Sequence, residues 1–278
     1  MNWLALDVGG ANIKASNGNG FALARSFAMW RSPAELPRAI SDVMQAAPES
    51  EALAITMTGE LADCFASKLE GVQSILSAVD RAADGREVAV YCTDGRWRGP
   101  SEACHDYLLA AASNWRALAE YSARFCSAGF GLLIDVGSTT TDLIPIVEGV
   151  PAALGKTDPE RLAEGELVYT GVERTPLCAL LESMTVGGKT VPVAAEAFAT
   201  TLDAYLLLGE LPEQPIAADT ADGRPRTIAA AHGRMARMAC ADATMMHLEE
   251  AAAAAQGVLQ RQLEMLEAAA QRVLHRLP

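Results

Sequence analysis

Leu4-Ala5-Leu6-Asp7-Val8-Gly9 is an apolar strand pattern that ends in Asp-Val-Gly, and it returns as Gly131-Leu132-Leu133-Ile134-Asp135-Val136-Gly137. The two copies are separated by the length of a whole domain, which is too long for a solenoid repeat. Each copy is followed by a second β-prone segment, at 13–16 and at 142–147, so each is expected to open a β-hairpin. The sequence therefore predicts a duplicated α/β architecture with domains at 1–126 and 127–278.

In the rest of the sequence, short apolar runs alternate with segments of helical periodicity, which is typical of the α/β class. Strands are expected at 3–8, 13–16, 21–27, 52–58, 87–92, 129–136, 142–147 and 166–170. Helices are expected at 33–47 with Ser32 as N-cap, and at 68–82, 102–111, 115–125, 158–163, 195–208 and 232–275. The Ala-rich part of the last segment, 249–273, is amphipathic and is expected to cover one face of a sheet.

The charge balance argues against a nucleic-acid partner. There are 22 Lys+Arg against 35 Asp+Glu, a formal net charge of −13, and no basic cluster. No apolar run reaches the ~18–20 residues that a membrane span needs, and the first residues have no basic segment of the secretory type. The six cysteines show neither zinc nor redox spacing. We expect a cytoplasmic protein with reduced thiols that acts on small molecules.

The two Asp-Val-Gly turns have the composition of a phosphate-binding site. Glycines permit positive φ and close backbone approach, and hydroxyl or amide side chains follow them in both copies. We predict that Asp7 and Asp135 hold Mg²⁺, directly or through water. Lys14 lies on the same face of the returning strand as Asn12 and is expected to neutralise a phosphate. The predicted diphosphate-binding residues are Gly9, Gly10, Asn12, Lys14, Gly137, Ser138, Thr139, Thr140 and Thr141.

The paired loops resemble those of the actin, sugar-kinase and heat-shock-ATPase superfamily, and more narrowly those of the hydantoinase/oxoprolinase family. Further segments resemble family members linked to tetrahydromethanopterin-dependent C1 transfer and methanofuran biosynthesis, and the resemblance runs from residue 4 to about residue 242. These segments are 56–63, 111–115, 165–172, 174–176 and 220–225. The resemblance implies two ribonuclease-H-like domains around a cleft.

The resemblance also implies a transferase that joins a phenol oxygen to the CH₂ carbon of an aminomethylfuran diphosphate and releases diphosphate. A phenol, with a pKa of about 10, needs a base or a nearby cation to attack at neutral pH. Glu60 is the first candidate base, with Asp94 and Asp142 behind it, and Lys14 is counted among the catalytic residues. Arg174 is a candidate anion ligand. The residues expected to line the substrate cleft are Gly59, Asp94, Asn114, Thr170 and Gly171.

Several alternatives stay open at this point. The same phosphate clamp would serve an ATP-dependent small-molecule kinase, or a nucleotide sensor that assembles like an actin relative into homo-oligomers. Glu60 is about as well explained as a solvated loop end, and Asp142 as a turn cap. Arg174 suits an ordinary surface ion pair, and Trp115 suits the hydrophobic core. The four histidines have no metal-ligand spacing.

Overall fold

The computed structural model describes residues 1–277, which form two compact units. Unit 1 comprises Met1–Gly131 and Ile146–Arg161, and unit 2 comprises Leu132–Pro145 and the described residues from 162 to 277. The chain passes between the units within strands β7 (Phe130–Val136) and β8 (Thr141–Val147). The sequence predicts a single domain boundary after residue 126. The structure differs from that prediction, because the segment 146–161 returns to unit 1.

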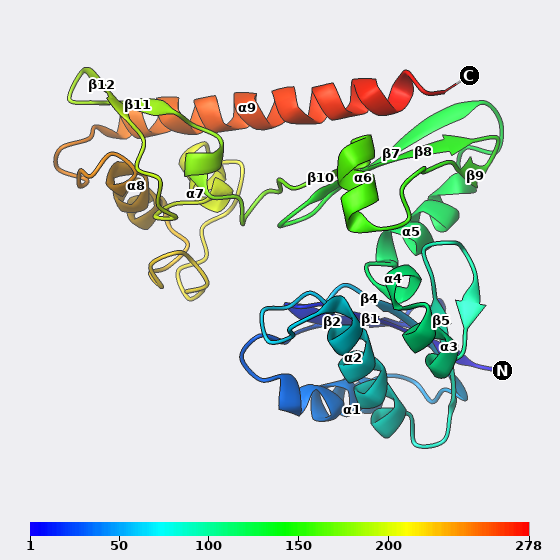
Figure 1. Ribbon diagram of the computed structural model, residues 1–278. Coiled ribbons are helices and arrows are strands. Elements are labelled where there is room, and N and C mark those ends of the chain that lie inside the picture. The colour runs from blue at the N-terminus through cyan, green and yellow to red at the C-terminus, as the bar shows by residue number, and fades with distance from the viewer. Residues whose placement is uncertain (278) are drawn as a thin grey trace. The chain divides into compact units, whose positions relative to one another are not determined.

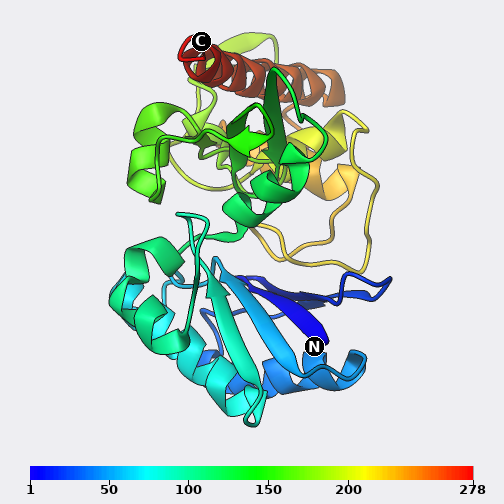
Figure 2. The ribbon, with the colours of Figure 1, turned by 90° about the vertical axis from the view of Figure 1, so that its right-hand side faces the viewer.

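Unit 1 is built on a six-stranded mixed sheet with the order β3-β2-β1-β4-β5-β6. Strands β1, β4 and β5 run parallel, whereas β2, β3 and β6 are antiparallel to their neighbours. Figure 2 shows these strands side by side, from blue β1 to cyan β5. The bounds are Trp3–Val8 for β1, Asn12–Ser16 for β2, Ala22–Ser26 for β3, Ala52–Met57 for β4, Glu87–Tyr91 for β5 and Trp97–Arg98 for β6.

One face of this sheet carries the core of unit 1. Leu4, Leu6 and Val8 of β1 point to that face and are buried against α1 (Leu36–Ala46) and α2 (Lys68–Ala83). The two helices lie together along the sheet in Figure 1. The alternate residues Ala5 and Asp7 point to the opposite face, because successive strand side chains alternate. The remaining helical segments of the unit are η1 (Pro33–Glu35), α3 (Pro100–His105), α4 (Tyr107–Ala110), α5 (Asn114–Ala123) and the start of α6 (Asp158–Glu164).

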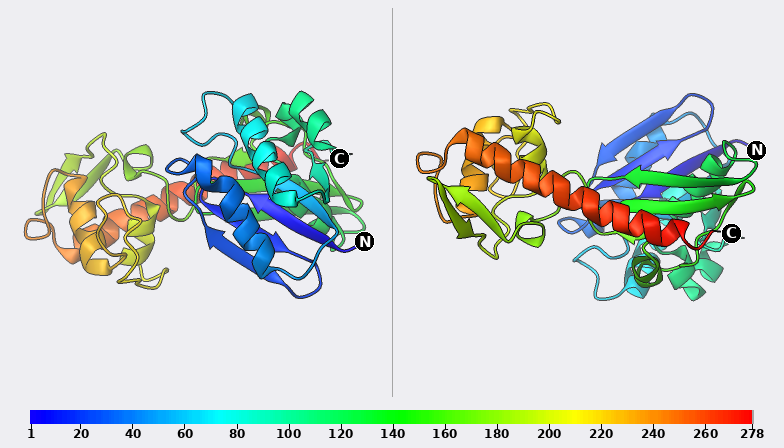
Figure 3. Two further views of the ribbon diagram at one scale, coloured as in Figure 1. Left: turned by 90° about the horizontal axis from the view of Figure 1, so that it is seen from below. Right: turned by 90° about the horizontal axis from the view of Figure 1, so that it is seen from above.

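Unit 2 combines a small sheet with a helical end. Its sheet has the order β10-β8-β7, with β10 at Leu167–Val168. Strand β9 (Val150–Pro151) pairs with the end of β8 that belongs to unit 1. The C-terminal helix α9 (Leu248–Leu274) packs its last turns on this sheet, where Ala269 and Val273 contact Leu143 and Val168. Its first half packs on the other helices, as Figure 3 shows. The expected cover for a sheet face is therefore confirmed for the last turns of α9 only. The other elements are η2 (Leu177–Ala179), β11 (Ser183–Val186), β12 (Lys189–Pro192), α7 (Thr201–Leu207) and α8 (Ile228–Arg237).

Three expected helices are wrong in extent. The helix expected at 195–208 begins only at Thr201, because Thr200 is extended and forms a β-bridge with Pro176. The helix expected at 102–111 is broken at Asp106, and the expected helix over 232–275 is divided into α8 and α9. Asp242 accepts hydrogen bonds from Thr244 in the connecting turn, an Asx-type interaction that competes with helix. Ser32 precedes a 3₁₀ turn and makes no side-chain cap.

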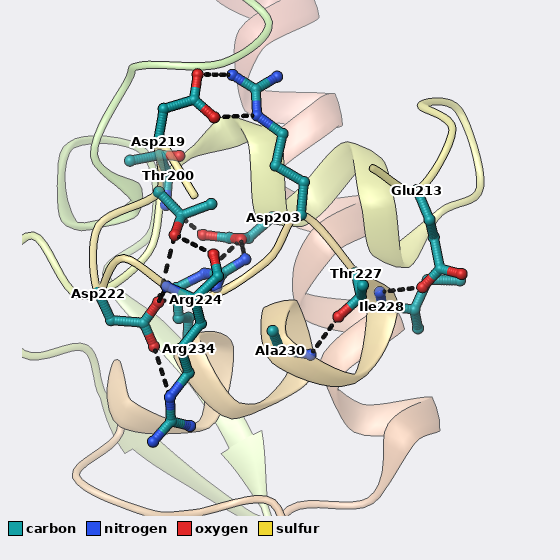
Figure 4. A network of polar contacts seen from close by, with 12 residues as sticks. Thr200, Asp203, Glu213, Asp219, Asp222, Arg224, Thr227, Ile228, Ala230 and Arg234 are labelled. Carbon is teal, nitrogen blue, oxygen red and sulfur yellow. Dashed lines mark hydrogen bonds and ion pairs between the residues drawn. The ribbon is translucent and has the colours of Figure 1, made fainter. Parts of the chain in front are cut away.

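A buried ion-pair network organises the helical end of unit 2 (Figure 4). Arg234 of α8 is fully buried, and its Nε donates to Asp203 Oδ1 of α7 at 2.8 Å. Its Nη1 donates to Asp222 at 3.0 Å, so the loop at 220–225 is held on α8. Arg237 contacts the second oxygen of Asp222 at 3.1 Å. The loop segment singled out in the sequence thus has a structural role.

Asp203→Ala is expected to lower the free energy of unfolding by about 3 kcal/mol, because it leaves a buried guanidinium without one of its two carboxylates. Urea denaturation followed by circular dichroism measures this change. Arg261→Ala is the matched control, since the Arg261–Glu264 pair is about half exposed and its loss should change stability by less than about 1 kcal/mol. Equal effects of the two substitutions would contradict the assignment.

Among the described residues, no helix combines the length and apolar character that crossing a lipid bilayer requires.

Candidate functional site

The first Asp-Val-Gly turn, which we call turn 1 (residues 9–12), is closed by a hydrogen bond from Gly9 N–H to the Asn12 carbonyl at 2.9 Å. A Cβ on Gly9 would lie 2.9 Å from the same carbonyl oxygen. Gly59, which follows β4, packs directly on this turn, and a Cβ there would lie 3.0 Å from the Gly9 carbonyl carbon. Glycine is therefore required at both positions by close backbone approach.

The second turn, which we call turn 2 (residues 137–140), repeats this geometry in unit 2. Gly137 N–H donates to the Thr140 carbonyl at 2.8 Å. Gly171 packs on turn 2, and a Cβ there would lie 2.6 Å from the backbone of Gly137, Ser138 and Thr139. The repeated sequence pattern thus folds into the same hydrogen-bonded turn twice.

Each turn leaves consecutive backbone N–H groups available. Within residues 1–277, the N–H groups of Gly10 and Ala11 in turn 1 and of Ser138 and Thr139 in turn 2 donate no hydrogen bond. Free adjacent N–H groups at a turn are suited to phosphate oxygens. None of Gly9, Gly10 and Gly137 has a positive φ, so the prediction that these glycines supply left-handed conformations is wrong. What they supply is room for backbone atoms.

Asp7 and Lys14 meet next to turn 1, on the face of the sheet opposite the core. They are cross-strand partners, and Lys14 Nζ lies 3.2 Å from Asp7 Oδ2. Thr56 of the neighbouring strand β4 donates to Asp7 Oδ1 at 3.3 Å. The prediction that Lys14 shares a face of β2 with Asn12 is confirmed, because both are exposed and Ile13 between them is buried. Thr56 was missed, although its register opposite Asp7 follows once β1 and β4 are known to be parallel.

The carboxylates fit a magnesium ion only in part. Within residues 1–277, no three His, Cys, Asp or Glu side chains form a cluster that could enclose a metal. A carboxylate has about four lone-pair sites, so Asp7 keeps acceptor capacity beside its two present partners. Magnesium usually binds through one or two carboxylates, waters and substrate phosphates. Asp7 suits that mode, and Asp135, which is exposed on β7, offers a comparable single carboxylate in unit 2.

Glu60 lies directly after Gly59 and is 1% exposed, so its interpretation as a solvated loop end is wrong. Its backbone packs against Gly71 of α2, where a Cβ would lie 2.0 Å from the Glu60 carbonyl oxygen. Burial raises the pKa of the Glu60 carboxyl from 4.5 to about 7, against a smaller lowering by backbone hydrogen bonds and the Lys68 charge. Its Oε2 has no hydrogen-bond partner within the described residues. The carboxyl is thus poised to gain or lose a proton near neutral pH.

Lys68 and Asp158 set the charge around Glu60, and sequence reasoning missed both. Lys68 Nζ lies 2.6 Å from Asp158 Oδ2, and both charges act on the Glu60 carboxyl. Ninety residues separate the partners, so no local pattern relates them. Only the return of 146–161 to unit 1 brings them together.

Four predicted site residues have structural partners instead. Arg98 contacts both oxygens of Asp94, at 2.9 and 2.8 Å, and this hydrogen bonding holds the pKa of Asp94 below its usual value, so Asp94 is a poor base. The Thr141 hydroxyl is buried and donates to the Thr170 carbonyl at 2.9 Å, which removes it from diphosphate binding. Thr170 and Gly171 are buried, and both accept hydrogen bonds from Gln262 of α9, at 2.7 and 3.0 Å. They support turn 2 from behind.

The other candidates are placed as follows. Asn114 begins α5, and Trp115 is buried with Arg161 stacked over its ring at 4.1 Å, so the core interpretation of Trp115 is confirmed. Asp142 lies within β8 opposite Leu167. The Arg174 N–H donates to the Ser138 carbonyl at 3.0 Å, which places Arg174 beside turn 2.

The family model of hydantoinase/oxoprolinase matches residues 51–274. The chain belongs to the hydantoinase/oxoprolinase family. The match excludes turn 1 but includes Glu60, turn 2 and the segment that supports turn 2, so most of the residues described above lie within the family region.

Two curated relatives of this chain have the same name, (4-{4-[2-(gamma-L-glutamylamino)ethyl]phenoxymethyl}furan-2-yl)methanamine synthase. The protein of Methanocaldococcus jannaschii is 35% identical over 95% of this chain and 79% of its own length. The protein of Methanococcus vannielii is 40% identical over 43% of this chain and 53% of its own length. A nucleotide-free acetone carboxylase structure is similar at a TM-score of 0.43 and 11% identity, covering 92% of this chain and 44% of that one. A likeness at that level supports no further conclusion.

Proposed function

We propose that this chain is an ether-forming transferase of methanofuran-type biosynthesis. An aminomethylfuran-methyl diphosphate and a phenolic acceptor of the γ-glutamyltyramine or tyrosine type are the proposed substrates. A lone pair of the phenol oxygen forms the new bond to the furan CH₂ carbon. The bond from that carbon to the diphosphate oxygen breaks, its electron pair leaves with diphosphate, and the phenol proton passes to a base.

The observation that carries this proposal is the relative from M. jannaschii, which is 35% identical across nearly the whole chain and is named for a phenoxymethylfuran product. The two turns with free N–H groups give independent support, because a diphosphate leaving group needs hydrogen-bond donors where negative charge develops. A furfuryl-type carbon that loses diphosphate gains cationic character. Stabilising the leaving group is therefore the main catalytic task.

The residue roles follow from position. Gly10, Ala11 and Lys14 are proposed to hold diphosphate oxygens at turn 1, and Ser138 and Thr139 offer the same donors in turn 2. Glu60 is the proposed base, since its pKa of about 7 suits proton transfer at neutral pH. Asp7 and Asp135 are the proposed carboxylates for Mg²⁺, which when bound neutralises charge on the diphosphate. The acidic chain must attract its anionic substrate through such local groups.

We further propose that both units are ribonuclease-H-like domains of the actin and sugar-kinase superfamily. Support for unit 1 comes from its strand order β3-β2-β1-β4-β5 with an antiparallel β2 and a parallel β4. Support for unit 2 comes from the repeated β-hairpin and its turn. The small polar substrates suit a cytoplasmic setting, and homo-oligomerisation stays a prediction.

Diphosphate release tests the reaction. The purified protein is incubated with Mg²⁺, the furan diphosphate and γ-glutamyltyramine, beside a reaction that contains ATP alone and one that contains ATP with the phenol. Diphosphate that appears only when both organic substrates are present, with the mass of the aryl ether, is the expected result. Consumption of ATP in either parallel reaction would favour the kinase alternative and overturn the synthase proposal.

Two substitutions beside turn 1 test the role of the Asp7–Lys14 pair. Lys14→Met is expected to lower kcat/KM for the diphosphate substrate by about 10- to 100-fold, because a charge-assisted hydrogen bond contributes about 1.5–3 kcal/mol. Asp7→Asn is expected to lower turnover most at limiting Mg²⁺. Lys189→Met, an exposed lysine of β12, is the matched control. Steady-state kinetics across a magnesium series measures both effects, and wild-type values for both variants at low Mg²⁺ would remove the Asp7–Lys14 pair from the mechanism.

A further inference from the structure

The open face of the six-stranded sheet carries a hollow of about 990 Å³ that lies entirely within unit 1. We call it the open-face hollow. Its floor is made of small side chains of the central strands, including Ala5 and Ala54, and α5 forms one wall. Small residues leave room above the sheet that larger ones would fill. The volume is at the upper end of the ~300–1,000 Å³ typical of small-molecule sites.

Three aromatic side chains line the open-face hollow. Tyr91 of β5 and Trp97 of β6 are cross-strand partners whose ring centroids lie 4.8 Å apart. Tyr121 of α5 is the third. Trp97 and Tyr121 are exposed at 57% and 55%, whereas Tyr91 is buried at 7% exposure, so Trp97 and Tyr121 provide most of the aromatic surface that a ligand could contact. Aromatic rings in this arrangement favour a flat aromatic ligand, because offset and edge-to-face contacts add to apolar burial.

Charged side chains also line the open-face hollow. Asp7 and Lys14 line it, and they adjoin turn 1, where the leaving diphosphate is proposed to bind. Arg124, the residue that ends α5, also lines it and lies 5.2 Å over the Tyr121 ring. Within residues 1–277, Arg124 forms no ion pair with a carboxylate, whereas Arg116 of the same helix is paired with Glu120. A guanidinium with spare donors beside aromatic rings suits an aromatic ligand that carries a carboxylate.

We infer that the open-face hollow binds the phenolic acceptor, with its ring against Tyr91, Trp97 and Tyr121 and its carboxylate on Arg124. The inference rests on the proposed function for the identity of the acceptor. It makes Arg124 a specificity-determining residue, because an acceptor without a carboxylate gains nothing from the guanidinium.

Direct binding tests this assignment without turnover. Isothermal titration calorimetry of the full chain uses γ-glutamyltyramine, which has the ring and the carboxylate, and tyramine, which lacks the carboxylate. Arg124→Gln is expected to weaken γ-glutamyltyramine binding about tenfold and to leave tyramine binding unchanged. Trp97→Ala is expected to weaken both ligands. Arg81→Gln is the control, since Arg81 lies on α2 and bonds Ser77.

Kinetics separates failure of this site from failure of the proposed reaction. Arg124→Gln is expected to raise the KM for γ-glutamyltyramine about tenfold with kcat within twofold of wild type. If wild-type turnover is present but both variants keep wild-type KM and affinity, the hollow is not the acceptor site and the proposed function stands. If wild type releases no diphosphate yet the ligand still binds with the predicted dependence on Arg124, the reaction is wrong and the binding site stands. Equal weakening of both ligands by Arg124→Gln would overturn the carboxylate contact.

Discussion

Glu60→Gln is expected to raise the free energy of unfolding by about 3 kcal/mol at pH 8 and by less than about 1 kcal/mol at pH 5. The pKa of Glu60 is raised to about 7 in the folded protein, against 4.5 for an ordinary glutamate. Between these values the folded state binds more protons than the unfolded state, so stability falls as pH rises from about 4.5 to 7. Glutamine keeps the size of the side chain and removes the cost of the buried charge. Urea unfolding at both pH values measures the difference.

The same substitution is expected to lower turnover by about 10²- to 10⁴-fold if Glu60 takes the phenol proton, which is the usual contribution of a general base. Wild-type kcat should then rise with pH through an apparent pKa of about 7, and the variant should lose that limb. Glu87→Gln, an exposed position at the start of β5, is the control for both readouts. A stabilised variant with wild-type turnover would assign Glu60 to structure alone. Unchanged stability at pH 8 would contradict the raised pKa itself.

Gly171→Ala is expected to abolish most turnover and to destabilise unit 2 by about 3 kcal/mol. The added Cβ would lie 2.6 Å from three backbone atoms of turn 2, a separation that only a backbone shift relieves. Overpacking of this kind usually costs about 1–3 kcal/mol and here displaces the N–H groups of Ser138 and Thr139. Thermal unfolding and the diphosphate-release assay measure the two effects.

Gly233→Ala provides the contrasting case for Gly171→Ala. Gly233 lies in α8 with open space where the Cβ would be, and alanine is preferred over glycine in a helix by up to about 1 kcal/mol. This variant should be as active as wild type and slightly more stable. Equal loss of activity in the two variants would show that turn 2 is not the element affected.

Local patterns predicted much of unit 1 and the two turns. The apolar alternation of β1 and β4, the glycines after β1 and β7, and the parity of Asp7 and Lys14 are properties of neighbouring residues, and the structure places them as expected. The helix expected at 195–208 failed for a tertiary reason, since Thr200 pairs with distant Pro176 and stays extended.

The residues of the candidate site show the same difference between local and tertiary effects. The sequence by itself determined which residues sit at the turns, because turn chemistry and strand periodicity act over a few positions. Only the tertiary structure decided which side chains are free to act. Arg98 donates a hydrogen bond to Asp94, and Gln262 of helix α9 donates one to Thr170. Glu60 is packed against α2, and burial raises its pKa. Burial and charge pairing depend on elements that are remote in sequence, since a pKa responds to everything within a few ångströms of the group, whatever its place in the chain.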